Sequence, residues 1–464
     1  MKRRLVVVAG LVAVAGLAVL LARRGDGQRP QAAAGGKRLA IERGLEPEAK
    51  QCIECHAEQE PGKVRDWAQS LHARANVTCI DCHRAQATDL DARDCPGTAD
   101  QPDLVVSPVV TPLDCSRCHP REAEQFARSK HARTWEITAV QIQDPWLRGM
   151  NNAVERATGC AMCHGSDISS GQLTALNWPN EGCGRLNPDD SKGSCVTCHT
   201  THRFSIIEAR KPENCGQCHM GPDHPQEEIY FESKHGKRYQ AEGHAWNFAS
   251  APDAWEPGSD FAAPTCAACH MAGLGPLATT HDVGERLKWE AQAPRTVPNQ
   301  DHEPEEARAR MLTVCSQCHS PRWGRNFLER YDLAIENYDV RYFAPAKKLM
   351  DQLYEEGVLS RWPVFDEAIE WTFYEFWHNE GRRARMGAAM MGPDYAWWHG
   401  FYELKKHYVK LVHQAAEARR RGHGAPVYIP GSGGKNLTPA DLPPMDEAWD
   451  RLEHLEGRPP ARED

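Results

Sequence analysis

The segment Cys195-Val196-Thr197-Cys198-His199 is followed by Cys215-Gly216-Gln217-Cys218-His219, and each has two cysteines three positions apart with a histidine after the second. The chain of 464 residues holds eight such segments. Their cysteine pairs are Cys52/Cys55, Cys79/Cys82, Cys115/Cys118, Cys160/Cys163, Cys195/Cys198, Cys215/Cys218, Cys266/Cys269 and Cys315/Cys318. The histidines are His56, His83, His119, His164, His199, His219, His270 and His319. This repeated pattern uses sixteen of the eighteen cysteines and dominates the sequence.

The C-x-x-C-H pattern is typical of covalent haem attachment, because its thiols bond the porphyrin vinyl groups and its histidine reaches the iron. With 22 histidines in the chain, chance would place one after all eight pairs with a probability on the order of 10⁻¹¹. Zinc sites would not need an adjoining histidine each time, and disulfides would need none. The sequence therefore predicts eight covalently bound haem c groups.

The amino-terminal segment predicts export. Lys2, Arg3 and Arg4 precede an apolar stretch over 5–22, as in a signal sequence. The run of alanines at 32–34 suits a cleavage site, whereas Arg23 and Arg24 after the apolar stretch suit a retained anchor. We therefore interpret residues 1–34 as a signal peptide or an amino-terminal membrane anchor. Both interpretations predict a periplasmic protein, held at the inner membrane if the segment is retained.

Composition and motif spacing predict a mainly α-helical fold. The mean hydropathy of -0.64 is low, so the haems themselves must fill much of the interior. We assign residues 35–320 to an octahaem cytochrome c domain with a haem-packed core, 321–425 to a region of long helices, and 426–464 to an extended tail. The stretch Val105–Val110 is the best strand candidate, and Pro108 predicts an edge or merely extended position for it.

One long helix is expected between Pro393 and Arg421. Apolar residues recur there at the three-or-four spacing of a single helical face. They are Trp398, Phe401, Leu404, Tyr408, Leu411 and Ala415. Pro393 suits the first turn, and Gly422 suits the end. Such a stripe is typical of a face buried in the core or against another subunit.

Six-coordinate haems need a second axial ligand, which histidines outside the motifs can supply. The first candidates lie near motifs or on polar turns, and they are His72, His131, His202 and His235. The further candidates are His281, His302, His378, His399 and His244. Of these we include His281 and His399 in the predicted ligand set.

Two cysteines and the net charge leave alternatives open. Cys95 and Cys183 could form a disulfide in an oxidising compartment, or they could both be buried thiols. The formal charge of -9 argues against nucleic-acid binding and favours a cationic redox partner, although a solvated acidic surface explains it equally well.

Several stretches resemble octahaem hydroxylamine oxidoreductases (HAO). They are Cys195-Val-Thr-Cys-His-Thr-Thr-His-Arg-Phe-Ser, Cys215-Gly-Gln-Cys-His-Met-Gly-Pro-Asp-His-Pro-Gln, Glu232-Ser-Lys-His-Gly, Thr280-His-Asp-Val-Gly and Gly381-Arg-Arg-Ala-Arg-Met-Gly-Ala-Ala-Met-Met-Gly-Pro-Asp-Tyr-Ala-Trp-Trp-His-Gly. The resemblance extends over nearly the whole chain after the amino-terminal segment. It departs in one respect, since the apolar segment is amino-terminal and no hydrophobic carboxyl-terminal helix is present.

The resemblance implies a homotrimer in which the fourth haem is catalytic and the other seven carry electrons between two histidine ligands each. Cys160, Cys163 and His164 would hold the catalytic haem, and Asp223 with His224 would accept the substrate's protons. Tyr395 matches a tyrosine that a neighbouring subunit donates and that bonds covalently to the catalytic haem.

The resemblance further implies oxidation of hydroxylamine, a small nitrogen substrate, to nitric oxide or nitrite, with a cytochrome c-type electron acceptor. Hydrazine oxidation would share every motif. Reduction of nitrite or hydroxylamine is disfavoured by Tyr395 and by the absence of a C-x-x-C-K segment. Pure electron transfer would require all eight haems to be six-coordinate.

Overall fold

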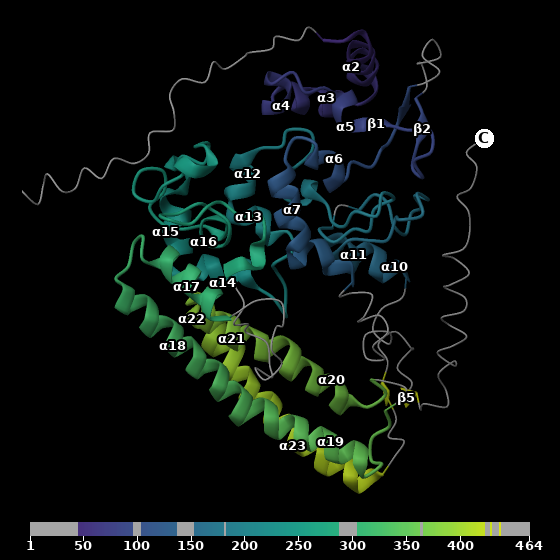
Figure 1. Cartoon of the computed structure of the whole chain (residues 1–464). Helices are drawn as coiled ribbons and strands as arrows, with labels where there is room; N and C mark the ends of the chain where they lie inside the picture. The colour runs from purple at the N-terminus through teal and green to yellow at the C-terminus, as the bar shows by residue number, and fades with distance from the viewer. Residues whose placement is uncertain are drawn as a thin grey trace, which may run out of the picture. The chain divides into compact units, whose positions relative to one another are not determined.

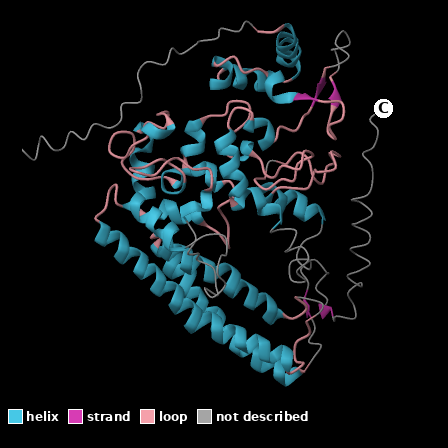
Figure 2. Cartoon of the chain, in the orientation of Figure 1, coloured by secondary structure: helices cyan, strands magenta, loops and turns pink. Residues whose placement is uncertain are grey.

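The computed structural model describes residues 45–95, 104–136, 153–180, 182–286, 304–361 and 365–422, together with the strand residues 427–428 and 436–437. Within these residues the regular structure is mainly helical, and each strand is only two residues long (Figures 1 and 2). The predicted mainly α-helical class is therefore confirmed. The predicted segment 1–34 lies outside the described residues. Among the residues that are described, no helix combines the length and apolar character needed to cross a membrane.

The part of the compact unit that carries the motifs consists of short helices, and this unit begins at Pro47. The α-helices are α2 (Pro47–Gln59), α3 (Pro61–Ala68), α4 (Leu71–Arg74), α5 (Cys79–His83), α6 (Pro112–Ser116), α7 (Pro120–Arg128), α10 (Ala153–Glu155), α11 (Ala161–His164), α12 (Ile206–Arg210), α13 (Pro212–Gly216), α14 (Gln226–Glu232), α15 (Lys234–Glu242), α16 (Cys266–His270) and α17 (Pro304–Cys315). Single turns of other helix types are η1 (Lys130–Arg133), η2 (Arg156–Cys160), η3 (Cys195–Thr197), η4 (Gly243–Ala245), η5 (Pro252–Ala254) and η6 (Val283–Arg286). Proline in the first turn starts several of them, because its fixed φ suits that position.

A small sheet corrects one prediction. Strands β1 (Arg84–Ala85), β3 (Val105–Val106) and β2 (Arg93–Asp94) pair antiparallel in the order β1-β3-β2. The segment predicted as an edge is thus the central strand. Pairing stops at Val106, so Pro108 falls beyond the ladder and removes no hydrogen bond from it.

Long helices follow the last motif, as the sequence predicts. They are α18 (Pro321–Tyr338), η7 (Asp339–Phe343), α19 (Ala344–Glu355), α20 (Ala368–Tyr374), η8 (Glu375–Glu380), α21 (Gly381–Met390), α22 (Pro393–Ala396), η9 (Trp397–Tyr402) and α23 (Glu403–Arg421). Helix α18 contacts α21, whereas α19 and α20 contact α23 (Figure 1). A core that includes Tyr338, Leu353 and Phe376 holds these helices together. Two short strands, β4 (Val427–Tyr428) and β5 (Asn436–Leu437), pair beyond them.

The helix expected over 393–421 is present but contains a π-helical segment. Leu404, Leu411 and Ala415 are buried as predicted, and Gly422 ends α23 with a φ of 76°. Trp398 does not follow the stripe, because its side chain is 53% exposed. The reason is η9, whose wider turn changes the phase between Trp398 and the buried face of α23.

A second core lies around the seventh motif. Trp255 is almost fully buried and stacks obliquely on Phe261, with ring centres 4.5 Å apart. Ala267 and Ala268, which are the two residues between Cys266 and Cys269, pack in the same cluster. This packing fixes helix α16 and therefore the direction in which His270 points.

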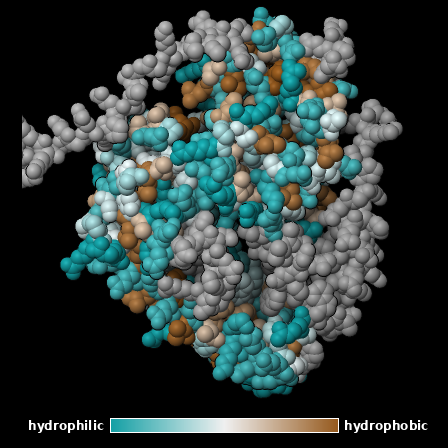
Figure 3. All heavy atoms as spheres, in the orientation of Figure 1, coloured by the Kyte–Doolittle hydropathy of each residue, from teal (hydrophilic) through white to brown (hydrophobic). Residues whose placement is uncertain are grey.

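Large apolar side chains beside the motifs are exposed. Leu71, Leu113, Met162 and Met220 each have half or more of their surface open to solvent. In the view of Figure 3, brown hydrophobic residues lie scattered among hydrophilic ones over the described surface. Apolar side chains next to the attachment residues suit contact with the face of a haem macrocycle, which is itself largely apolar.

Candidate functional site

Each motif presents its thiols and imidazole from about one turn of helix. In several motifs the backbone N–H of the histidine donates to the carbonyl of the first cysteine. Examples are His119 to Cys115 at 2.8 Å and His319 to Cys315 at 2.9 Å. Capping boxes begin two of these turns, with Asp81 bonding Thr78 and Asp114 bonding Thr111. A helical turn brings positions i, i+3 and i+4 to one side. The local structure therefore fits attachment of one haem at each motif.

Three attachment cysteines are more exposed than the others. Cys55, Cys118 and Cys318 are exposed, whereas the other attachment cysteines are half-buried. Each of the three is the second cysteine of its motif, in the first, third and eighth segments. These three side chains are exposed because of where they lie relative to the helices.

Cys55 lies beside the exposed Glu54 on the outer side of α2, and Cys118 and Cys318 come just after α6 and α17 end. The bond from a cysteine is made to a vinyl group at the edge of the macrocycle. Cys55, Cys118 and Cys318 therefore stay predicted attachment residues.

Five motif histidines face a second histidine ring at a nearly constant spacing. The ring centres are separated by 6.2 Å for His72 and His119, 6.2 Å for His83 and His202, 5.9 Å for His131 and His219, 6.3 Å for His199 and His281, and 6.1 Å for His235 and His319. Two imidazoles on opposite sides of one iron would stand roughly 6 Å apart, from two metal–nitrogen bonds of roughly 2 Å and the distances from nitrogen to ring centre. The five pairs thus have the spacing that a shared iron requires.

The first, fourth and seventh motifs differ from these five. Among the described residues, no such ring pair involves His56, His164 or His270. The candidate His302 lies outside the described residues, so it adds nothing here. The other candidates lie elsewhere: His244 is in η4, His378 is in η8, and His399 has its Nδ1 2.9 Å from the carboxylate of Asp394.

The fourth motif is supported by a loop that passes close to its backbone. The hydroxyl of Thr134 donates to the carbonyl of His164 at 2.9 Å, and the amide of Asn180 donates to the carbonyl of Ala161 at 2.8 Å. Gly165 follows the motif with a φ of 90°. A side chain at Gly165 would collide with the backbone of Gly184, so this approach requires glycine.

Asp223 and His224 lie beside the fourth motif. The Nδ1 atom of His224 and Oδ1 of Asp223 are 2.5 Å apart. The charge of His224 acts on both Cys163 and His164, which places the pair close to the attachment residues. The two residues that the sequence predicts for proton transfer are therefore brought together with His164.

Helices α20 and α21, with η8 between them, bring further polar residues to this pair. Arg382 donates from Nη1 to Oδ2 of Asp223 at 3.1 Å, and Nε2 of His378 lies 3.8 Å from the same oxygen. Arg383 donates to the carbonyl of Pro222 at 2.7 Å and holds the loop in place. In the sequence alone His378 is only a candidate haem ligand and Arg382 has no predicted role, although Arg382 belongs to the run that resembles HAO.

Burial and the neighbouring charges set the protonation of this cluster. Burial opposes ionisation of Asp223, but the hydrogen bond and charge of His224, with His378 and Arg382, outweigh it and lower the pKa of Asp223. The hydrogen bond to Asp223 raises the pKa of His224 above its usual value, against the effect of burial. Burial and Arg382 lower the pKa of His378 to about 4. The cluster therefore holds an ionised Asp223 beside a relatively basic His224.

Tyr374 completes the surroundings of the cluster. Its ring stacks on that of His378 with centres 4.5 Å apart. Burial, followed by the charge of Asp223, raises the pKa of Tyr374 to about 12, and Cys160 contributes in the same direction. A neutral phenol between the cluster and the fourth motif can donate one hydrogen bond.

Tyr395 lies at the start of a helix that packs on α14. Its backbone N–H donates to Oε2 of Glu232 at 3.5 Å, and its ring stacks on His399 with centres 5.2 Å apart. Burial raises the pKa of its phenol, and Glu228 adds to the effect. The charged neighbours of Tyr395 in its own chain are thus outside the fourth motif. Donation of Tyr395 to a neighbouring chain stays a prediction.

In several places a thiol of one motif lies close enough to shift the pKa of a thiol in another motif. The neighbouring pairs are Cys52 and Cys79, Cys82 and Cys115, Cys115 and Cys195, Cys198 and Cys215, Cys163 and Cys218, Cys215 and Cys266, and Cys269 and Cys315. By these pairs, the first motif adjoins the second, the second adjoins the third, the third adjoins the fifth, and the fifth adjoins the sixth. The fourth and the seventh both adjoin the sixth, and the eighth adjoins the seventh.

The two remaining cysteines are not joined in the structure. Cys95 lies near Cys52. The thiol of Cys183 donates to the carbonyl of Cys163 at 3.3 Å and lies 3.4 Å from the hydroxyl of Thr134. Of the two alternatives for these residues, the structure therefore favours separate thiols.

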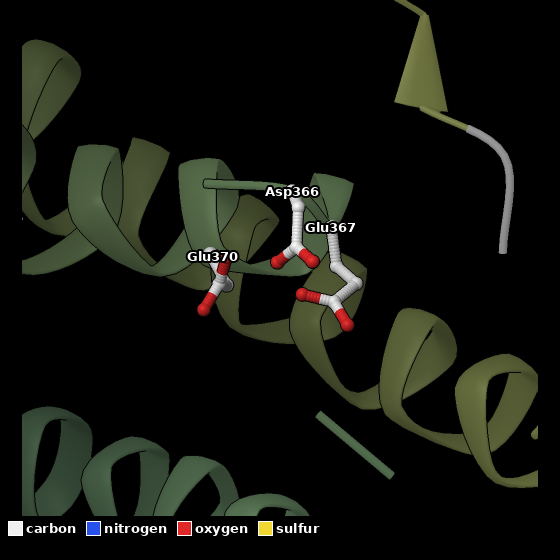
Figure 4. Close-up of side chains that lie close together, drawn as sticks. All are labelled: Asp366, Glu367 and Glu370. Carbon is white, nitrogen blue, oxygen red and sulfur yellow. The ribbon is translucent and has the colours of Figure 1, made fainter. Parts of the chain in front are cut away.

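An acidic cluster occurs in the helical region, formed by Asp366, Glu367 and Glu370 (Figure 4). Each offers a carboxylate oxygen within 4.8 Å of the others. Tyr354 donates its hydroxyl to Oε1 of Glu370 at 2.5 Å. Burial raises the pKa of Glu370 to about 7, and burial with the hydrogen bond to Asp366 raises that of Glu367 to about 9. Protonation thus relieves the repulsion within the cluster.

Family models match two parts of the chain. Residues 179–362 match the family described as seven times multi-haem cytochrome CxxCH. Residues 114–200 match the family of cytochrome c554 and c-prime. These matches, with the motifs, show that the chain carries multiple covalently bound c-type haems.

Known proteins resemble the chain over most of its length. A probable nitrite reductase-hydroxylamine oxidoreductase fusion protein of Kuenenia stuttgartiensis is 25% identical over 81% of this chain. The match spans 52% of that relative, so the chain corresponds to about half of its length. A solved hypothetical multiheme protein matches with a TM-score of 0.69 and 25% identity, over 82% of this chain and 97% of the other.

A further solved structure is part of a reducing HAO-like protein complex of Kuenenia stuttgartiensis. Its TM-score is 0.62 at 23% identity, and the match covers 81% of this chain and 86% of the other. The chain therefore has the mainly helical fold of multihaem cytochromes and ends in long helices.

Proposed function

We propose that this multihaem cytochrome oxidises hydroxylamine to nitric oxide or nitrite at a haem held by Cys160, Cys163 and His164. The observation that carries the proposal is the half-buried pair of Asp223 and His224 beside His164.

The chain's own residues would manage the protons. Haem bound at the fourth motif would supply an iron that takes electrons from the substrate nitrogen. Each electron removed from hydroxylamine is accompanied by a proton, so the site needs a base. His224 would take that proton on its imidazole, whose Nδ1 faces the carboxylate of Asp223. Asp223 would fix the orientation of the imidazole and stabilise its cation.

Arg382 would hold Asp223 in its ionised state. Its guanidinium bonds the oxygen of Asp223 that does not face His224. With one carboxylate oxygen held by Arg382 and the other facing the imidazole, the carboxylate cannot rotate freely. His378, whose lowered pKa keeps it neutral near pH 7, would add a polar group without a second positive charge.

Electrons would leave through the other haems. The neighbouring thiols of Cys163 and Cys218 make the sixth motif the first step. From there one arm runs through the fifth, third, second and first motifs, and the other runs through the seventh and eighth. We propose eight haems per chain, seven of them held between two histidines, with a cytochrome c-type acceptor.

The remaining parts of the proposal concern assembly and location. We propose a periplasmic homotrimer in which Tyr395 of one chain bonds covalently to the catalytic haem of the next. The exposed Trp397, Trp398 and Tyr402 near Tyr395 supply an aromatic face of the kind that subunit contacts use. His399, which stacks on Tyr395, stays in the proposed ligand set.

A second candidate is reduction of nitrite or hydroxylamine at the same haem. The guanidinium of Arg382 beside the Asp223 pair could hold an anion such as nitrite. The curated relative, whose name includes nitrite reductase, makes this direction worth testing.

Steady-state assays of the purified holoprotein separate these functions. Hydroxylamine and hydrazine are supplied with an oxidised cytochrome c, and nitrite is supplied with a reduced viologen. We expect turnover with hydroxylamine and little with nitrite. Faster turnover with nitrite than with hydroxylamine would favour the reductive candidate. No turnover with any of the three substrates would favour pure electron transfer.

A further inference from the structure

Arg286 is a buried cation beside the seventh motif. It is the last residue of η6, and its side chain has 0% of its surface exposed. Its Nη1 donates to the carbonyl of Cys269 at 3.2 Å. Its Nη2 donates to the carbonyls of Ala272 at 2.8 Å and Ala278 at 3.2 Å. The guanidinium is thus fastened to the backbone that follows the second attachment cysteine.

The partners of Arg286 do not neutralise its charge. All three acceptors are backbone carbonyls, and Nε has no hydrogen-bond partner among the described residues. Glu285, the acidic residue whose charge acts on Arg286, accepts a hydrogen bond from Thr280 at 2.7 Å and lies 3.7 Å from the guanidinium of Arg310. An arginine keeps its proton even when it is buried, so a net positive charge stands here.

This charge acts on the residues that would hold the seventh haem. The Nη1 atom of Arg286 lies 3.2 Å from the carbonyl oxygen of Cys269, the residue that precedes His270. In an interior of low dielectric, a charge at this range interacts far more strongly than it would in water. A nearby positive charge favours the form of a redox centre that has gained an electron.

We propose that Arg286 raises the reduction potential of the haem at Cys266, Cys269 and His270, and so draws electrons from the sixth motif into the arm that contains the seventh and eighth. The sixth motif adjoins the fifth, because Asn214 beside Cys215 donates to the carbonyl of Cys198 at 2.9 Å, and it adjoins the seventh, because helix α13 contacts helix α16. The direction taken at this branch therefore depends on the relative potentials of the two neighbours. The inference rests on haem attachment at these motifs, and it holds whichever substrate the fourth haem uses.

The test is a redox titration of the holoprotein in which Arg286→Met removes the charge and keeps most of the side-chain volume. Haem reduction is followed by optical spectra and by low-temperature electron paramagnetic resonance. We expect one haem to become harder to reduce, with its ratio of reduced to oxidised form at a fixed potential falling by about tenfold or more, which is about 59 mV for one electron. Arg286→Lys keeps the charge and should retain most of the wild-type value.

Arg210→Met is the matched control. Arg210 is also buried and also donates to two carbonyls, those of Phe248 at 2.8 Å and Ser250 at 2.6 Å. Its charge faces Asp260 and lies over the ring of Trp255, with 4.4 Å to the ring centre. Its loss should disturb packing similarly while shifting the potentials much less.

The haem content of every variant is measured by intact mass, which separates failure of attachment from failure of the inference. If Arg286→Met yields no holoprotein, Arg286→Gln, which can still donate to a carbonyl, replaces it. A neutral variant with wild-type haem content and unchanged potentials would overturn the inference. An equal shift in Arg286→Lys would do so as well, because it would assign the effect to lost hydrogen bonds.

Discussion

Asp223 is held by partners that act on its two oxygens separately, with His224 on one and Arg382 on the other. Asn in its place would keep the size of the side chain but not its charge. We expect Asp223→Asn to lower kcat for hydroxylamine by roughly 10²- to 10⁴-fold, because proton transfer contributes about that much. Steady-state kinetics with haem content checked by mass would measure it.

Glu380→Gln is the control for this variant. The carboxylate of Glu380 is buried, and it lies 3.1 Å from Nδ1 of His407. It therefore reproduces the loss of a buried acid–imidazole pair without touching the proposed base. Equal losses of turnover in the two variants would mean that Asp223 supports the fold and has no part in the chemistry.

The protonation of His224 predicts the pH dependence. A base must be neutral to accept a proton, and the hydrogen bond from Asp223 raises the pKa of His224 above 6.5. Activity should therefore rise with pH through a pKa above that value and be lost on the acid side. In Asp223→Asn the raising interaction is removed, so the residual activity should rise at a lower pH. Profiles of kcat/KM against pH would show the shift, and coincident profiles would exclude His224 as the titrating base.

At the scale of elements, the motif helices and the long carboxyl-terminal helices follow from the sequence, because fixed spacings and three-or-four periodicity are local signals. The π-helical segments η7, η8 and η9 do not, since a wider turn leaves no residue type as its mark. Because the sequence does not reveal η9, the apolar spacing wrongly predicts that Trp398 lies on the buried face of the helix.

Burial and long-range contacts also escape local patterns. All eight motifs share one spacing, so the sequence does not distinguish the exposed Cys55, Cys118 and Cys318 from the half-buried attachment cysteines. His378 and Arg382 join Asp223 only through tertiary packing across more than 150 positions of sequence. Such features depend on how helices pack, which a motif alone does not encode.

The acidic cluster before and within α20 makes stability depend on pH. Burial raises the pKa of Glu370 to about 7, so the folded protein holds this proton more tightly than the unfolded chain does. Stability should therefore fall as the pH rises from about 4.5 to about 7, and it should level off above the folded-state pKa. Glu370→Gln removes this penalty and should stabilise the protein at pH 8 by roughly 1–3 kcal/mol.

Thermal unfolding followed by circular dichroism at pH 5 and pH 8 would measure this effect. Asp351→Asn on α19 is the control, because Asp351 is exposed and pairs with Lys347 on the surface. The gain in the Glu370→Gln variant should appear at pH 8 and be small at pH 5. An equal change at both pH values would show that the carboxyl group is not the source.

At the scale of the whole molecule, the proposed bond from Tyr395 predicts a covalent assembly. One link at each interface of a cyclic trimer joins all three chains. Denaturing electrophoresis of the wild type should therefore retain a species of about three chains. Tyr395→Phe should release single chains and move the chemistry towards reduction, whereas Tyr402→Phe on the neighbouring η9 should leave the assembly linked. A wild type that runs wholly as single chains would refute the bond.

The contacts between thiols also determine how the chain would respond to losing one cofactor. Along the neighbours described here, the fourth motif reaches the other motifs only through the sixth, by Cys163 and Cys218. Removing the sixth motif would separate the remaining motifs into three groups that do not adjoin one another: the fourth alone, the seventh with the eighth, and the other four. Damage to the first or the eighth haem would shorten an arm. Damage to the sixth would leave substrate oxidation without any outlet for its electrons.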